Sequence, residues 1–130
     1  MTTELYYLTL SALLAAFLWV PYTLNVIAAN PITDAVGYPE QPLRMAPWAE
    51  RLKKAHYNAV ENLVVFAALI LTAHLLDAGN GMTEAAAMTY FWARVVHAVA
   101  YTAAIPWVRT LAFAVAWAAM VLIAWVILHG

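Results

Sequence analysis

The chain alternates long apolar stretches with short polar ones. Four apolar stretches stand out, and each reaches the roughly 20 residues that a helix needs to cross the hydrocarbon layer of a membrane. They cover residues of about 5–29, 48–76, 84–104 and 106–128. Continuous runs of this length lack the alternation of barrel strands, which leaves helices as the spanning form. The pattern therefore predicts an all-α integral membrane protein of one domain, an up-down bundle of four transmembrane helices.

The connections between these stretches differ in length. The first, residues 30–47, holds four of the six prolines, which disfavour regular structure and indicate either an ordered cap or a mobile lid. Residues 77–82 form a plain turn, and residues 105–107 form a very tight one, in which Pro106 suits the first turn of the last helix. Pro21 predicts a kink in the first helix.

Composition agrees with a membrane protein and excludes several other classes. Of 130 residues, 66% are hydrophobic and only 10% are charged, too few charges to cover a soluble domain. A net charge of −1 gives no indication of nucleic-acid binding, and the absence of cysteine excludes disulfides and a cysteine nucleophile; no metal site is predicted. The N-terminus carries Glu4 and no basic residue, so we expect a retained helix and not a cleaved signal peptide.

Charge is distributed unevenly between the two ends of the predicted helices. The basic residues beside the first and third connections are Arg44, Arg51, Lys53, Lys54 and Arg109. The opposite ends carry Glu4, Asp77 and Glu84 and no Lys or Arg. Because basic residues stay on the cytoplasmic side, we expect the first and third connections, residues 30–47 included, in the cytoplasm and both termini outside. On this basis alone Arg51 and Lys53 are orientation anchors.

Polar residues form one stripe on each of two helices. The second predicted helix carries Arg51, Lys54, Asn58 and Glu61, at spacings of three, four and three. The third carries Tyr90, Arg94, His97 and Tyr101, at spacings of four, three and four. With a rise of ~1.5 Å per residue, Glu61 and Arg94 lie at similar depth. A lone charge there costs at least ~2.5–3.5 kcal/mol, so we predict a Glu61–Arg94 ion pair inside the bundle, structural, functional or both.

The same stripes predict a cationic pocket closer to the cytoplasm. Its candidate residues are Lys54, Asn58, His97, Tyr101, Arg109 and Thr110. The N-terminus of the last helix adds a positive end and free N–H groups. Such a pocket suits a small anion, together with an apolar co-substrate that arrives from lipid. Lys54 and Arg109 are equally well explained as anchors, and for His56, one position off the stripe, we favour a packing contact or a contact to the first connection.

Two motifs resemble those of the MAPEG superfamily, the membrane-associated proteins in eicosanoid and glutathione metabolism. They are "ERLKKAHYNAVENL" (residues 50–63) and "WARVVHAVAYTAAIPWVRTLAF" (residues 92–113), and the likeness extends over essentially the whole chain. The short bacterial, glutathione-transferase-like branch is the most similar. Lys54 and Tyr57 stand where well-known family enzymes carry arginine, and a lysine cannot make the two-pronged carboxylate contact of an arginine.

The resemblance implies a homotrimer in the bacterial inner membrane, with glutathione bound between neighbouring subunits near the cytoplasmic face. It implies thiolate stabilisation by Arg109 and Thr110. The implied glutathione contacts are Asn58, Glu61, His97 and Tyr101, beside which we place Lys54 and Arg94. The Glu61–Arg94 contact then lies within one chain or between two.

Three functions remain open at this point. The first is a glutathione-dependent transferase or peroxidase that acts on lipophilic electrophiles. The second is a non-catalytic trimeric scaffold, or a binder of lipid or a small anion, which has lost full glutathione chemistry. The third, a transporter or proton path, is disfavoured because the chain has no inverted repeat and no broken helix beyond Pro21.

Overall fold

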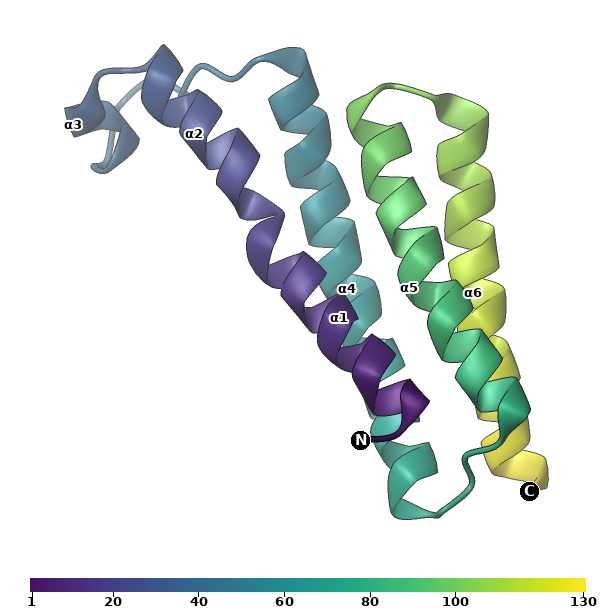
Figure 1. Cartoon of the computed structure of the whole chain (residues 1–130). Helices are drawn as coiled ribbons and strands as arrows, with labels where there is room; N and C mark the ends of the chain where they lie inside the picture. The colour runs from purple at the N-terminus through teal and green to yellow at the C-terminus, as the bar shows by residue number, and fades with distance from the viewer.

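A computed structural model of the chain describes all 130 residues, and every regular element in it is a helix. The helices build four long rods that run alternately up and down (Figure 1). In chain order they are α1 (Thr3–Phe17), α2 (Trp19–Ala29), the short α3 (Ile32–Ala35), α4 (Pro47–Leu75), α5 (Gly81–Thr102) and α6 (Pro106–His129). The first rod consists of α1 and α2, and α3 lies within the first connection. The predicted all-α class is confirmed.

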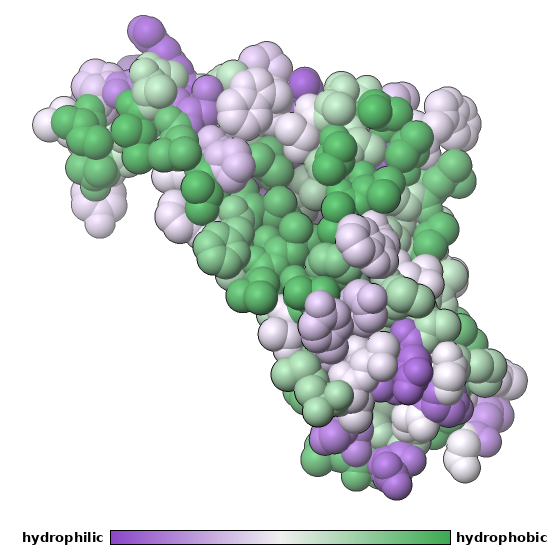
Figure 2. All heavy atoms as spheres, in the orientation of Figure 1, coloured by the Kyte–Doolittle hydropathy of each residue, from purple (hydrophilic) through white to green (hydrophobic).

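Three of the rods are long and apolar enough to cross a membrane. They are Thr3–Ala29, Pro47–Leu75 and Pro106–His129. In Figure 2 hydrophobic residues cover the middle of the visible face, whereas hydrophilic residues gather toward its two ends. The chain is therefore an integral membrane protein, as predicted. The fourth rod, α5, carries a polar stripe and lies along α6 (Figure 1).

The helix α5 begins at Gly81, three residues before the start expected from hydrophobicity. Asn80 explains the difference, since its Oδ1 accepts hydrogen bonds from the backbone N–H groups of Met82 and Thr83. In return Thr83 Oγ1 accepts from the Asn80 N–H, which completes a capping box. Capping by polar side chains thus extends α5 by three residues that the apolar pattern had assigned to the turn.

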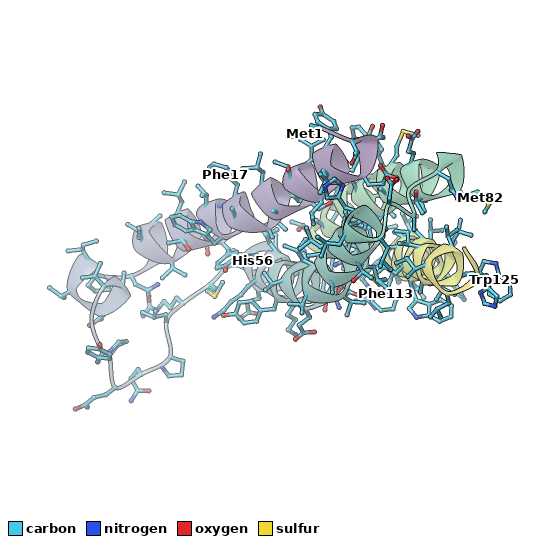
Figure 3. All side chains as sticks on the ribbon, turned by 90° about the horizontal axis from the view of Figure 1, so that it is seen from below. Met1, Phe17, His56, Met82, Phe113 and Trp125 are labelled. Carbon is cyan, nitrogen blue, oxygen red and sulfur yellow. The ribbon has the colours of Figure 1, made fainter.

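The first rod breaks at Leu18, between α1 and α2. Pro21 accounts for the break, because it has no N–H to donate and its ring collides with the carbonyl four residues earlier. His56 of α4 holds both sides of this break: Nδ1 lies 2.7 Å from the Tyr22 hydroxyl and Nε2 lies 2.9 Å from the Ala15 carbonyl. In Figure 3 His56 lies between the rod and α4. The contact of His56 is therefore with the first rod and not with the first connection.

The first connection is closed at its base by two asparagine side chains. Asn30 pairs with the backbone of Arg44 in both directions, at 2.9 Å for each hydrogen bond. One step closer to α4, Asn25 Oδ1 accepts from the Ala46 N–H at 2.9 Å. Of the two alternatives for this connection, an ordered cap and a mobile lid, these contacts favour the ordered cap. The connection, with α3, projects away from α5 and α6 (Figure 1).

The core lies between α4, α5 and α6. Phe66 and Tyr90 stack at 3.8 Å between ring centroids, and both are almost completely buried. Small residues of α6 let the helices approach closely, and Ala112, Ala116 and Ala119 are all buried. These alanines therefore serve close packing between the helices. Tyr90 is also the first residue of the polar stripe of α5, and Arg94 follows about one turn later.

Candidate functional site

Arg94 of α5 is the central charged group, with only 3% of its surface exposed. Its Nη2 donates a hydrogen bond of 2.6 Å to Oδ1 of Asn58 on α4. Its Nε and Nη1 are buried and have no partner. A buried charge is costly unless it is paired and its hydrogen bonds are satisfied. Two edges of this guanidinium therefore lack an acceptor within the chain.

Glu61 does not pair with Arg94 within the chain, so this form of the predicted ion pair is wrong. The Glu61 side chain is exposed, and Asn58 takes the place next to Arg94. The reason is rotational: three residues turn a helix by about 300°, so Glu61 lies about 60° around α4 from Asn58. With Asn58 facing α5, Glu61 faces outward. A contact between two chains, the other alternative, stays a prediction.

Asn62 is part of this arrangement, although the sequence analysis did not single it out. Its Nδ2 donates to the backbone carbonyl of Asn58 at 2.8 Å and lies 3.3 Å from Asn58 Oδ1. The Asn58 oxygen thus accepts from Asn62 on one side and from Arg94 on the other. The signal in the sequence was the spacing of four residues between the two asparagines, which places both on one side of the helix.

His97, Tyr101 and Arg109 continue from Arg94 toward the turn between α5 and α6. His97 is 3% exposed, and its Nδ1 has no hydrogen-bond partner. Its ring meets Tyr101 edge-on at 5.6 Å, and the Arg109 guanidinium lies 4.7 Å from the centre of the Tyr101 ring. An arginine in this position is attracted by the face of the ring. Four of the predicted site residues are therefore brought into one line.

A pocket of about 230 Å³ lies at the end of this line. Arg51, Tyr101 and Arg109 line it, together with small and apolar residues of the α5–α6 turn. This volume is below the ~300–1,000 Å³ that is usual for small-molecule sites. Two arginines at the wall make the pocket electropositive.

Arg51 has a role that the anchor interpretation missed. Its Nε donates a hydrogen bond of 3.0 Å to the carbonyl of Thr102, at the C-terminal end of α5. The last carbonyls of a helix have no partner within the helix, and a basic side chain there also suits the negative end of the helix dipole. Arg51 therefore fixes α4 to the end of α5 while it lines the pocket.

Lys54, Glu61 and Thr110 lie outside this group. All three are exposed on the single chain. The Thr110 hydroxyl donates to the Pro106 carbonyl of its own helix at 3.1 Å. The structure therefore brings together Asn58, Arg94, His97, Tyr101 and Arg109, but leaves these three on the outer surface. No set of His, Asp and Glu side chains gathers as metal ligands.

Comparison with protein families gives one result, which covers both motifs. The model of the MAPEG family matches residues 7–129. The chain belongs to the MAPEG family. This membership confirms the resemblance of the two motifs, and it supports a membrane protein of the superfamily of glutathione and eicosanoid metabolism. A comparison with curated proteins finds no match. Which chemistry this MAPEG chain carries must therefore be argued from its own residues.

Proposed function

We propose that this MAPEG member is a glutathione-dependent transferase or peroxidase that acts on lipophilic electrophiles in the membrane. The observation that carries the proposal is the set of buried nitrogens without a partner, Nε and Nη1 of Arg94 and Nδ1 of His97, beside an electropositive pocket. Glutathione offers two carboxylates and an ionisable thiol, which are acceptors for the free N–H groups of Arg94. The free nitrogens of Arg94 are buried in the single chain, so they meet the ligand only when the site is complete, while Asn58 still holds Nη2.

The completed site belongs to a homotrimer with four spans in each chain. Because α4 and α6 run in the same direction, α5 has to return across the membrane between them (Figure 1). The basic residues then place the first and third connections in the cytoplasm of a bacterial inner membrane. An exposed carboxylate midway along α4 is unfavourable in lipid, so Glu61 faces a neighbouring chain. Each site lies at the boundary between two neighbouring subunits.

Within this site each residue has a separate task. Glutathione supplies the thiol that acts as nucleophile or reductant. Arg109 and the N–H groups of the first turn of α6 stabilise the thiolate, which lowers the pKa of the thiol from its usual ~8.5. Thr110 turns its hydroxyl from the Pro106 carbonyl to the sulfur. The residues that hold the peptide are Lys54, Asn58, Glu61, Arg94, His97 and Tyr101.

The test is the ultraviolet absorbance of the glutathione thiolate at neutral pH when the tripeptide is added to the purified protein. We expect a thiolate signal with the wild-type chain and its loss in Arg109→Ala. Lys53→Ala is the matched control, since it removes a basic residue that lines no part of the pocket. An absent signal, together with no binding at millimolar glutathione, would remove this function.

A second candidate is a non-catalytic trimeric scaffold or a binder of lipid or a small anion. The hydrogen bond of Thr110 to its own helix favours it, because that proton is not available to a sulfur. An apolar groove of about 600 Å³ between α5 and α6, lined by Met88, Trp92 and Val115 among others, also favours it. Lipid retained through purification, without thiolate formation, is the outcome expected for this candidate.

A further inference from the structure

Asn58 has an amide with two chemically different ends, and its surroundings accept only one orientation. The oxygen accepts hydrogen bonds, whereas the NH₂ group donates two. Arg94 Nη2 and Asn62 Nδ2, the two groups that approach this end of Asn58, are both donors. Rotation of the amide by half a turn would place NH₂ against two donors. The oxygen therefore has to face Arg94.

Asn62 is itself held in place. Its Nδ2 donates to the backbone carbonyl of Asn58 at 2.8 Å, which fixes the direction in which its second N–H points. That direction is toward Asn58 Oδ1, at 3.3 Å. We infer that Asn62 is a positioning residue, which locks the Asn58 amide so that its oxygen holds Arg94 and its NH₂ group is left for a ligand.

The consequence concerns the kind of ligand that the site accepts, and this step rests on the proposed function. Because the Asn58 oxygen already accepts from Arg94 and Asn62, only the NH₂ group of Asn58 is left to bind a ligand, and it is a donor. The free groups of Arg94 are also donors. The inner end of the site is therefore composed of donors and selects a carboxylate, which only accepts, over a neutral amide, which would bring an NH₂ group against them.

A simpler explanation has to be separated from this one. Polar side chains in apolar helices often bond to the carbonyl four residues earlier merely to satisfy themselves. Thr72, on the same helix, does so at 2.7 Å to Ala68. Asn62 differs from Thr72 because it also reaches a side chain that contacts a buried charge. Thr72→Val is therefore the matched control.

The experiment compares Asn62→Leu, Asn62→Thr and Asn62→Gln with wild type in detergent. The first removes every donor, the second keeps a hydroxyl for the helix carbonyl, and the third keeps an NH₂ group on a longer arm. One readout is the dissociation constant of glutathione. The other is the nitrogen NMR signal of the Arg94 guanidinium without ligand, assigned with Arg94→Lys.

We expect Asn62→Leu and Asn62→Thr to weaken glutathione binding about three- to tenfold, the loss of one hydrogen bond. Both should also increase the exchange broadening of the Arg94 signals, while Asn62→Gln recovers binding and signals and Thr72→Val changes neither. Unchanged Arg94 signals in both Asn62→Leu and Asn62→Thr would overturn the inference, as would an equal loss in Asn62→Gln. If wild type binds no glutathione, the proposed function fails, and the Arg94 signals alone decide the role of Asn62.

Discussion

At the scale of single residues, the central feature is the buried guanidinium of Arg94, which has one acceptor within the chain. Arg94 is anchored to Asn58 by a short hydrogen bond, and its other edges face no acceptor. Pairing of charged groups inside apolar surroundings is strongly favoured, since the alternative is an unsatisfied charge. Within the chain Arg94 therefore depends on Asn58 alone, and under the proposed function a bound carboxylate would satisfy the other nitrogens.

Because Arg94 depends on Asn58, a single substitution at Asn58 should cost more stability than a double substitution at both residues. Asn58→Leu should destabilise the protein by about 1–3 kcal/mol, because it leaves the guanidinium with no partner. Asn58→Leu combined with Arg94→Leu should recover most of this loss, since no charge is then buried. Thermal unfolding of wild type, both single variants and the double variant in one detergent measures the interaction free energy between Asn58 and Arg94. Losses that simply add would mean that the two side chains do not depend on each other.

At the scale of helices, the apolar pattern was sufficient for the rods but not for their rotation. Long hydrophobic stretches and Pro21 indicated the rods and the break in the first one. The pattern could not decide whether Asn58 or Glu61 faces Arg94, because residues three apart share a face and differ by only about 60°. Nor could it reveal that Arg51 binds the end of α5, since that contact joins residues far apart in the chain.

The break at Leu18 gives a prediction about the first rod. His56 contacts Tyr22 on one side of the break and Ala15 on the other. His56→Phe fills a similar volume but removes both hydrogen bonds, so α2 and the first connection should lose their fixed angle to α4. We expect a broader distance distribution between spin labels at Ile27 and Val108, both exposed, measured by pulsed electron resonance.

The control for this variant is His74→Phe, at the far end of the same helix and exposed. It should leave the distribution as narrow as in wild type. A narrow distribution in His56→Phe as well would mean that packing of Tyr22 against Ala49 and Leu52 is enough to hold the rod.

At the scale of the whole molecule, the single chain leaves the Glu61 side chain of α4 uncovered. Only 26 of 130 residues are buried, and the exposed face of α4 carries a carboxylate within an apolar helix. Apolar side chains on that face can remain in lipid without cost, but Glu61 cannot. The pocket beside Arg51 and Arg109 is likewise too small for a complete site. The homotrimer that we propose would answer both observations, because a neighbouring copy would cover α4 and enlarge the pocket.

Glu61→Ala distinguishes a Glu61 side chain that is buried in an assembly from one that is exposed to lipid. The substitution should be destabilising in the first case and stabilising in the second. If a neighbouring chain covers Glu61 and pairs with it, the substitution leaves the basic partner of Glu61 buried without its acid. The trimer is then weaker, and the protein concentration at which half of it has dissociated should rise several-fold. If Glu61 faces acyl chains, removal of a charge that costs at least ~2.5–3.5 kcal/mol should improve insertion and leave the assembly state unchanged. Native mass spectrometry from mild detergent reads the assembly directly, and Glu50→Ala, at the start of α4, controls for loss of charge alone.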